Sequence, residues 1–445
     1  MKFVVIGADA AGMSAASRAK RNRPDLEVTV LEQTQDVSYS ACGMPYNIAD
    51  PHRDIEELVV RRAEVFREKQ GIDLRTGHRA ERIDPGARTV AGSAADGTPF
   101  RFSYDRLLIA TGASPIVPDL PGLDRPEVAT LKNLQDGRKI RELLAGGRVK
   151  KAVVIGMGYI GLEMIEAFRG RGIEVSMVKP GKGFLPWLDE TLSSEVQTEV
   201  EKHGVGVHPG HEILRLEKAD GRLALVCDGL TLDADLVLVA AGIRPNSRIA
   251  EEAGLSLSVS DAVSVDRTLA TSDEHIYAAG DCADAYHMVT GKKTWIPLAL
   301  VANRAGWAVA DNVSGKRAEI EGVAGTAVFK VFDLQVARTG LTAAEAEQAG
   351  FSPASVTIKT RSRAHAHPGS TAVHVHLVGD RDSGRLLGAF MVAREGVHRI
   401  DAAAVALQAQ MSVSRFAQAD LAYAPPFGPT WDPLLTAANQ LVKKL

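Results

Sequence analysis

The chain opens with a short apolar run, a glycine-rich turn, a stretch of helical periodicity and a second apolar run. Residues 2–6 and 27–31 have the length and the β-branched content of buried strands, and residues 13–21 have the spacing of a helix. A strand, a helix and a strand in this order form a βαβ unit with parallel strands. The segment therefore predicts an α/β fold built on a parallel sheet.

The turn that follows the first strand is Gly7-Ala8-Asp9-Ala10-Ala11-Gly12, which is close to the GxGxxG turn that holds a dinucleotide pyrophosphate. Asp9 stands in place of the second glycine, so its side chain holds the backbone back and its charge repels a phosphate. Glu32 follows Gly12 by twenty residues, where a carboxylate hydrogen-bonds a ribose hydroxyl. The match predicts a nucleotide site, and a turn that only packs a helix is the alternative.

The same pattern returns complete in the middle of the chain, where the apolar run 151–155 leads into Gly156-Met157-Gly158-Tyr159-Ile160-Gly161. The three glycines allow, in order, the tight turn, the approach of the pyrophosphate and the close packing of helix on strand. The next strand, 174–178, ends at Lys179, where an NADH site usually carries an acid. Lys179 and Lys182 either meet the 2′-phosphate of NADPH or are solvated, and the sequence leaves both readings open.

Three further apolar runs end in small-residue turns, at 107–113, 239–246 and 276–283. The first is expected to close the first nucleotide unit, the second to close the second unit, and the third to bring the chain back to the first. Two dinucleotide sites in one chain usually serve to pass a hydride from one ring to the other, so we expect FAD and NAD(P)H. Asp281, in the last turn, is placed to hydrogen-bond the ribityl or phosphate end of the flavin.

Composition narrows the class of protein. A length of 445 residues predicts two or three domains. The net charge of −3 gives no basis for binding nucleic acid, and no apolar run approaches the roughly 18 residues of a membrane helix. The N-terminus lacks the apolar segment of a signal peptide. Three widely spaced cysteines cannot form a disulfide framework, which predicts a cytoplasmic protein.

Cys42 is the candidate redox residue, and it lies ten residues after Glu32. A CxxxxC redox pair needs a second cysteine at position 47, where the chain has Asn47. The chemical partner of this thiol is therefore a flavin, an oxidant or the sulfur of another molecule. We expect Cys227 and Cys282 to be packing residues without a redox role.

In combination, the Ala110-Thr111-Gly112 turn, the GxGxxGxE segment that ends at Glu163, and Gly280-Asp281 resemble the pyridine nucleotide-disulfide oxidoreductase family over essentially the whole chain. The resemblance implies two Rossmann-like domains, for FAD (1–115 and 250–320) and for NAD(P)H (116–249), and an α+β dimerisation domain (321–445) of a homodimer. It also implies that Glu163 aligns the nicotinamide and that Tyr159 is a gate beside the flavin. The implied FAD contacts are Gly7, Ala10, Ala11, Gly12, Glu32, Gln33, Ala80, Thr111, Gly112, Asp281 and Ala299. The implied NAD(P)H contacts are Gly156, Gly158, Tyr159, Ile160, Gly161, Glu163, Lys179 and Gly242.

Within the family, the lone cysteine resembles that of coenzyme A-disulfide and persulfide reductases, NADH oxidases and NADH peroxidases. Oxidases and peroxidases typically carry a histidine where this chain has Ala10, so oxygen chemistry lacks its usual proton donor. The run Tyr423-Ala424-Pro425-Pro426 looks like the segment that coenzyme A-disulfide reductases extend to the partner's cysteine. Residues 396–405 read as a helix suited to a two-fold contact. The implied coenzyme A contacts are Ser14, Arg18, Arg21, Ser38, Cys42, Tyr423 and Trp431.

The basic residues Arg18, Lys20, Arg21 and Arg23 favour a phosphate-rich substrate, because guanidinium groups bind phosphate bidentately. A solvated helix face is the alternative interpretation. If the phosphate interpretation holds, a second basic set extends the phosphate-binding groove, namely Arg61, Arg62, Arg67 and Lys69.

Histidines stand where coenzyme A-disulfide reductases commonly have tyrosines, at His365 and His367 before Pro368-Gly369. Tyr423 is then the expected hydroxyl donor to the sulfur, and the two histidines are alternatives because imidazole titrates near neutral pH. His374 and His376 alternate along a strand-like run and share one face. No acid or cysteine completes a metal site with them, and we predict no metal.

The predicted reaction passes electrons from NAD(P)H through FAD to Cys42, which cycles through a mixed disulfide with coenzyme A. It requires the site to lower the pKa of Cys42 below that of a free thiol. One alternative is an NADH oxidase or peroxidase in which Cys42 cycles through sulfenic acid. Another is a redox-sensing or electron-carrier flavoprotein.

Overall fold

The computed structural model describes residues 1–219 and 222–445. The first predicted unit is present: β1 (Lys2–Ile6) and β2 (Glu27–Leu31) pair in parallel and are joined by α1 (Ala10–Asn22). The helix begins three residues before the predicted Met13, because the glycine turn passes directly into it and the amide of Met13 donates to the carbonyl of Asp9 at 2.9 Å.

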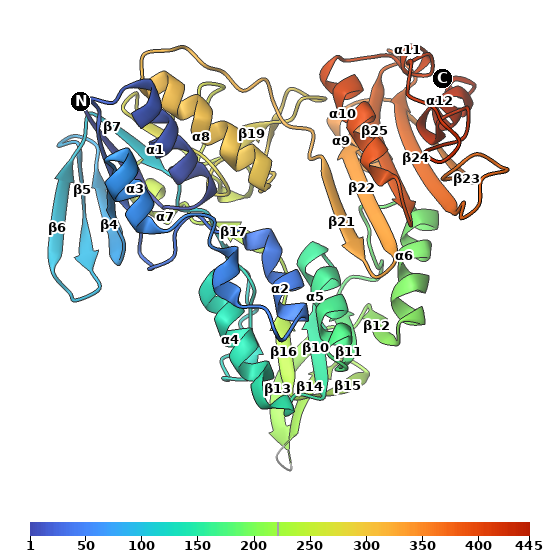
Figure 1. Cartoon of the computed structure of the whole chain (residues 1–445), viewed down its shortest axis with the longest axis horizontal. Helices are drawn as coiled ribbons and strands as arrows, with labels where there is room; N and C mark the ends of the chain where they lie inside the picture. Colours follow the sequence, from blue (N-terminus) through green and yellow to red (C-terminus); the bar gives the residue numbers. More distant parts are fainter. Residues whose placement is uncertain (220–221) are drawn as a thin grey trace.

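The first sheet has the order β18-β7-β1-β2-β3 and its strands are parallel. Its remaining strands are β3 (Asp73–Arg75), β7 (Arg106–Ile109) and β18 (Ile276–Ala278). Figure 1 shows α1 and α8 (Ala299–Val313) packed side by side next to this sheet. Gly306 allows that approach, because a Cβ there would lie 2.3 Å from the carbonyl oxygen of Ala11. Burial by helices explains why the strands are continuous apolar runs.

A three-stranded antiparallel sheet flanks this part at its outer edge in Figure 1. It consists of β4 (His78–Asp84), β5 (Thr89–Ala94) and β6 (Pro99–Ser103). Short elements complete the region: α3 (Ala63–Gln70), α7 (Arg248–Glu252), β19 (Ala285–Tyr286) and β20 (Lys293–Thr294). The short helix α2 (Met44–Ala49) leaves this region and packs beside the helices of the second sheet (Figure 1).

The second sheet is also parallel, in the order β12-β11-β10-β16-β9. Its strands are β9 (Val128–Ala129), β10 (Lys151–Ile155), β11 (Glu174–Lys179), β12 (Val205–Pro209) and β16 (Leu236–Val239). The two chain connections between the first and second sheets pair with each other, as β8 (Ala113–Pro115) and β17 (Ile243–Pro245). Around this sheet lie α4 (Leu134–Leu144), α5 (Tyr159–Gly170), α6 (Glu190–Lys202), β13 (Ile213–Ala219), β14 (Arg222–Cys227) and β15 (Leu230–Ala234).

The third sheet is antiparallel, in the order β21-β22-β25-β24-β23. Its strands are β21 (Ala327–Val331), β22 (Leu334–Gly340), β23 (Pro353–Arg361), β24 (Ala372–Asp380) and β25 (Leu386–Ala393). The helix predicted at 396–405 begins with a 3₁₀ turn and continues as α10 (Ile400–Gln408), beside α9 (Ala343–Ala349), α11 (Val413–Phe416) and α12 (Pro433–Val442). One continuous apolar core joins the second and third sheets. No helix in the described part of the chain is long and apolar enough to cross a membrane.

Candidate active site

A cavity of about 1500 Å³ lies where the three sheets approach one another. Its wall is built from the first glycine turn, the segment that carries Cys42, the start of α5, the start of α8 and strands β21 and β22. Parallel sheets commonly bind their ligands at the carboxyl ends of the strands, and both glycine turns follow such ends here. The cavity therefore brings both predicted nucleotide turns and the candidate thiol together.

The first glycine turn is held tightly. Gly7 has a φ of +107°, and a Cβ there would lie 2.2 Å from the carbonyl oxygen of Ala110. A Cβ at Gly12 would lie 1.9 Å from the carbonyl oxygen of Gly7. The carboxylate of Glu32 accepts a hydrogen bond from the amide of Ala8 at 2.9 Å, so Glu32 fixes the turn from the next strand. This arrangement fits a dinucleotide held at the N-terminus of α1.

The other residues predicted around FAD divide into two groups. Ala10, Asp281 and Ala299 line the cavity. Thr111 and Gly112 lie at the crossing between the first two sheets, where the Thr111 hydroxyl donates to the carbonyl of Asn246 at 2.6 Å. Predicted residues outside the cavity wall are Gly7, Ala11, Gly12, Glu32, Gln33, Ala80, Thr111 and Gly112.

The second glycine turn repeats this geometry. Gly156 has a φ of +112°, and a Cβ there would lie 2.2 Å from the carbonyl oxygen of Ala240. Gly158 faces open space, with no atom of the described residues within 4 Å of the place of a Cβ, so a pyrophosphate can approach its backbone. A Cβ at Gly161 would lie 2.9 Å from the carbonyl oxygen of Gly156, which keeps helix and strand close. Of the predicted NAD(P)H contacts, the cavity is lined by Gly158, Tyr159, Ile160, Glu163 and Gly242.

Cys42 lies in a 3₁₀ turn (Ala41–Gly43) before α2 and is exposed to the cavity. Cys227 and Cys282 are buried, and the thiol of Cys282 points to the carbonyl of Ile109 at 3.4 Å. Although the thiol faces the cavity, the atoms packed around it remove much of its solvent, which raises its pKa, and the carboxylate of Glu163 raises it further. The ammonium of Lys132 acts in the opposite direction, and the lowering of this pKa that the reaction requires, expected from the dipoles of a bound flavin and a nearby helix N-terminus, stays a prediction.

Glu163 and Tyr159, both in the first part of α5, line the cavity. Glu163 accepts a hydrogen bond from the hydroxyl of Tyr46 at 3.0 Å, and burial raises the pKa of its carboxyl. Tyr159 packs against Phe329 and Trp187, with ring centroids 5.0 and 5.4 Å apart. These contacts hold the proposed gate residue in an aromatic cluster that includes a strand of the third sheet.

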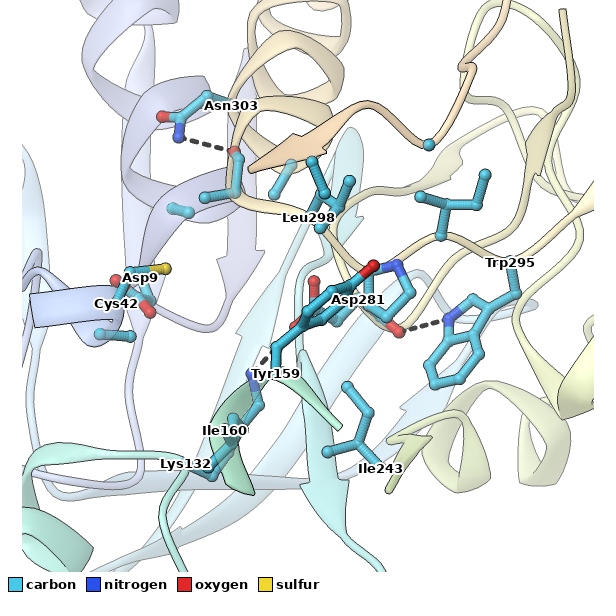
Figure 2. A pocket seen from close by; sticks show the side chains of 18 of the residues that line it. Asp9, Cys42, Lys132, Tyr159, Ile160, Ile243, Asp281, Trp295, Leu298 and Asn303 are labelled. Atoms are coloured by element: carbon cyan, nitrogen blue, oxygen red, sulfur yellow. Dashed lines mark hydrogen bonds and ion pairs between the residues drawn. The ribbon is translucent and has the colours of Figure 1, made fainter. Parts of the chain in front are cut away.

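Asp281 has a partner that the sequence analysis missed. The ammonium of Lys132 pairs with its carboxylate at 2.9 Å, and the indole of Trp295 donates to its backbone carbonyl at 2.9 Å. Figure 2 shows these three residues around the pocket, with Cys42 on its other side. Lys132 precedes α4, far from Asp281 in the chain, so no local motif could reveal the pair.

The residues predicted to contact coenzyme A, three on α1 and Ser38 after β2, have different surroundings. Arg21 and Ser38 line the cavity, as does Ser14, whose hydroxyl donates to Asn303 at 2.5 Å. Arg18 is instead engaged by the carboxylate of Asp311 at 2.7 Å and lies over the ring of Trp307. The other basic residues of the run are also paired or bonded locally: Lys20 to backbone carbonyls and Arg23 to Asp25. Arg61 joins Arg21 in the cavity wall.

Tyr423 and Trp431 do not reach the cavity of their own chain. Their side chains are 49% and 63% exposed on the C-terminal part, near Phe427 at 75%. Within one chain, the structure therefore does not bring Tyr423 and Cys42 to the same cavity.

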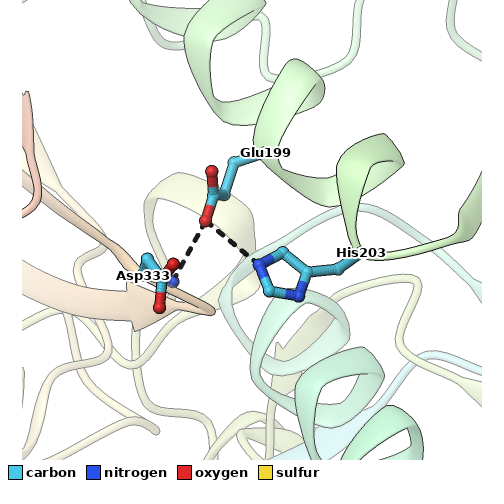
Figure 3. Close-up of side chains that lie close together, drawn as sticks. All are labelled: Glu199, His203 and Asp333. Carbon is cyan, nitrogen blue, oxygen red and sulfur yellow. Dashed lines mark hydrogen bonds and ion pairs between the residues drawn. The ribbon is translucent and has the colours of Figure 1, made fainter.

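His374 and His376 are buried, not at the surface, and each faces a carboxylate from the α6 region. His374 lies 3.4 Å from Glu195, and His376 lies 3.5 Å from Asp189. Among the described residues, the group of possible metal ligands is elsewhere, at Glu199, His203 and Asp333 (Figure 3). Arg394 pairs with both acids of that group, so we interpret the group as an ion-pair network between α6 and the third sheet.

Lys179 ends β11 and lies outside the cavity wall. His208 is on the neighbouring strand, paired with Val178, and His211 follows with its ring 6.5 Å from that of His208. Burial and the neighbouring His211 lower the pKa of His208, which favours its neutral form.

Two Rossmann-type sheets, an antiparallel C-terminal sheet and a lone cavity-facing thiol define an oxidoreductase of the two-dinucleotide class. The chain belongs to the pyridine nucleotide-disulphide oxidoreductases: the model of that family matches residues 1–306, and the model of its dimerisation domain matches residues 326–433. The fold class and the family predicted from the sequence are thereby confirmed.

Three similar proteins have names that refer to sulfur oxidoreduction, NADH oxidation and persulfide reduction. The NAD(P)H sulfur oxidoreductase (CoA-dependent) of Pyrococcus abyssi is 38% identical over 439 residues, which cover 98% of this chain and 97% of that protein. The NADH oxidase of Methanocaldococcus jannaschii is 32% identical over 450 residues, covering 100% and 99%. A solved structure of a NAD-dependent persulfide reductase from A. fulgidus has a TM-score of 0.96 at 38% identity, covering 100% of this chain and 83% of that one.

Proposed function

We propose that this protein is an FAD-dependent oxidoreductase that uses NAD(P)H to reduce coenzyme A disulfide or coenzyme A persulfide through Cys42. The observation that carries the proposal is a single exposed thiol in a cavity that both dinucleotide turns approach. Relatives named as a CoA-dependent sulfur oxidoreductase and a persulfide reductase support it.

In this proposal the first glycine turn, Glu32 and Asp281 hold FAD, and the turn at Gly158 holds NAD(P)H. Bound FAD would supply the two-electron chemistry that links the nicotinamide to the sulfur. Glu163 orients the nicotinamide side of the cavity and is itself fixed by Tyr46. Tyr159, which lines the cavity, would act as the gate residue between the nicotinamide and flavin sites.

The sulfur steps balance with one disulfide and two electrons. The thiolate of Cys42 attacks one sulfur of coenzyme A disulfide, forms a mixed disulfide and releases one coenzyme A thiolate. Two electrons from NAD(P)H then break the mixed disulfide, which frees the second coenzyme A and restores the Cys42 thiolate. With a persulfide, the terminal sulfur leaves as hydrosulfide in the corresponding step.

The coenzyme A phosphates are assigned to Arg21 and Arg61, which line the cavity, and its polar chain to Ser14 and Ser38. In this assignment Arg18 is a positioning residue and not a phosphate ligand, because its guanidinium is already bound by Asp311. Tyr423 and Trp431 of the partner subunit in a homodimer complete the site near Cys42.

A second candidate is an NADH oxidase, favoured by the named Methanocaldococcus relative and by the exposure of Cys42. Ala10 argues against it, since that position lacks a side chain able to protonate a leaving hydroxide.

Oxidation of NAD(P)H, with either coenzyme A disulfide or oxygen as acceptor, separates the two candidates. We expect disulfide-dependent turnover to exceed oxygen-dependent turnover and to vanish in Cys42→Ser. Cys227→Ser, which changes a buried strand residue far from the cavity wall, is the matched control and should keep activity. Turnover with oxygen alone, unaffected by the disulfide, would favour the oxidase.

A further inference from the structure

Asp9 occupies the second glycine position of the first turn and is the residue there that least suits a phosphate. It is the N-cap of α1, yet its carboxylate makes no capping hydrogen bond with the helix. Its side chain instead lines the cavity, on the same side as Cys42 in Figure 2. The acid is therefore directed at the space assigned to FAD.

The charges around this carboxyl are predominantly negative. Within residues 1–219 and 222–445, the groups acting on Asp9 are the carboxylates of Glu32 and Asp281 and the ammonium of Lys132. Lys132 is already paired with Asp281 at 2.9 Å. The backbone of Tyr39 adds one hydrogen bond, while the Tyr39 hydroxyl and the Cys42 thiol are neutral neighbours whose ionisation Asp9 opposes.

A dinucleotide pyrophosphate brings two more negative charges to this helix N-terminus. The helix dipole offers only about half a positive charge in return. An ionised Asp9 would leave three carboxylates and a pyrophosphate around one lysine that is already paired, in a cavity where charges are poorly screened. Removal of the Asp9 charge is the least costly way to relieve this repulsion.

We propose that Asp9 takes up one proton when FAD binds and remains a neutral carboxylic acid in the holoenzyme. The proposal rests on the proposed function, because FAD is taken as the occupant of the first turn. Burial, opposed by Lys132, already raises the pKa of Asp9 to about 6 without any ligand, which places the proton uptake in an accessible range.

The coupling of proton uptake by Asp9 to FAD binding determines how the dissociation constant of FAD depends on pH. Below about pH 6, Asp9 is already protonated in the free protein, so the dissociation constant of FAD is independent of pH. Above that pH, binding must bring in one proton, and the dissociation constant rises about tenfold for each pH unit until the holoenzyme itself releases the proton.

The test is the release of FAD from diluted holoenzyme, followed by flavin fluorescence from about pH 5.5 to about pH 9. We expect the wild-type slope to be lost in Asp9→Asn, which mimics the neutral acid, and in Asp9→Gly, which restores the glycine. Asp25→Asn removes a charge near the other end of α1, outside the cavity, and should keep the slope. A wild-type affinity that does not change with pH, or an unchanged slope in Asp9→Asn, would overturn the proposal.

A second readout does not depend on a variant that retains FAD. The infrared spectrum of the wild-type holoenzyme at neutral pH should contain a protonated carboxyl band that shifts in heavy water, and Asp9→Asn should lack it. Absence of that band in the wild type contradicts the proposal even where FAD is bound. A protein that binds no FAD at any pH would instead contradict the proposed function.

Discussion

At the scale of single residues, Glu163 is, after burial, the group that most raises the pKa of the Cys42 thiol. Its carboxylate raises the pKa of the Cys42 thiol, so its removal should favour the thiolate. In Glu163→Gln we expect a lower thiol pKa and faster alkylation of the reduced enzyme by iodoacetamide at neutral pH. The measurement is the alkylation rate of Cys42 as a function of pH.

The control for that experiment is Glu166→Gln, one turn further along α5, where the carboxylate pairs with Lys330. It should leave the alkylation profile of Cys42 in place. Equal profiles in Glu163→Gln and the wild type would show that burial alone sets the reactivity of the thiol.

Lys179 is the residue expected to choose between the two nicotinamide nucleotides. A charge-assisted hydrogen bond to a 2′-phosphate is worth about 1.5–3 kcal/mol, or roughly tenfold or more in affinity. Lys179→Glu should therefore shift the ratio of kcat/KM for NADPH over NADH by about tenfold or more toward NADH. Lys150→Glu, on an exposed residue just before β10, is the charge-matched control. An unchanged ratio in Lys179→Glu would mean that Lys179 is only solvated.

At the scale of elements, α6 joins the second sheet to the third through buried histidines. Burial lowers the pKa of His374 and of His376, while Glu195 and Asp189 oppose that shift only partly. When folding lowers the pKa of a histidine, the unfolded state takes up a proton more readily than the folded state. Acid pH therefore favours unfolding. The histidine contribution to stability is thus fully present above the unfolded pKa of about 6.5 and is lost as the pH falls from there through the lower pKa of the folded state.

We therefore expect the midpoint of thermal unfolding to drop between about pH 7.5 and about pH 5, and to drop less in the double variant His374→Gln, His376→Gln. His52→Gln, on an exposed loop residue, is the matched control. Calorimetric scans across this range make the comparison, and a drop of the same size in the double variant would place the acid sensitivity elsewhere.

The elements themselves could largely be predicted from the sequence, because both nucleotide turns combine local signals: an apolar run, glycines at fixed spacing and a helix start. The site could be predicted only in part. Lys132 with Asp281, Tyr46 with Glu163 and Arg18 with Asp311 are contacts between distant segments, and they depend on how the sheets meet. The burial of His374 and His376 was missed for the same reason. The helix that covers them is α6, which lies between two strands of the second sheet in the sequence.

At the scale of the whole molecule, the proposed site needs two chains. Tyr423 is half exposed and outside the cavity of its own chain, and the C-terminal part matches a dimerisation domain. If Tyr423 donates a proton to the sulfur bound at Cys42 of the partner subunit, Tyr423→Phe should slow disulfide turnover by about 10²-fold, the usual scale of a lost general acid. Reduction of the flavin by NAD(P)H should stay nearly intact.

Mixed dimers decide whether the tyrosine acts across the interface. A heterodimer of Tyr423→Phe and Cys42→Ser chains contains one pocket with both residues intact, so we expect activity to return after mixing. With heterodimer formation established, no recovery would mean that Tyr423 serves its own subunit or takes no part in the sulfur chemistry.

The central claim, that Cys42 carries coenzyme A during turnover, is tested most directly by the intact mass of the purified protein without reductant. The account predicts an added mass equal to one coenzyme A per chain, removed by reductant and absent from Cys42→Ser. An unmodified Cys42, both in the purified protein and after exposure to coenzyme A disulfide, would contradict it.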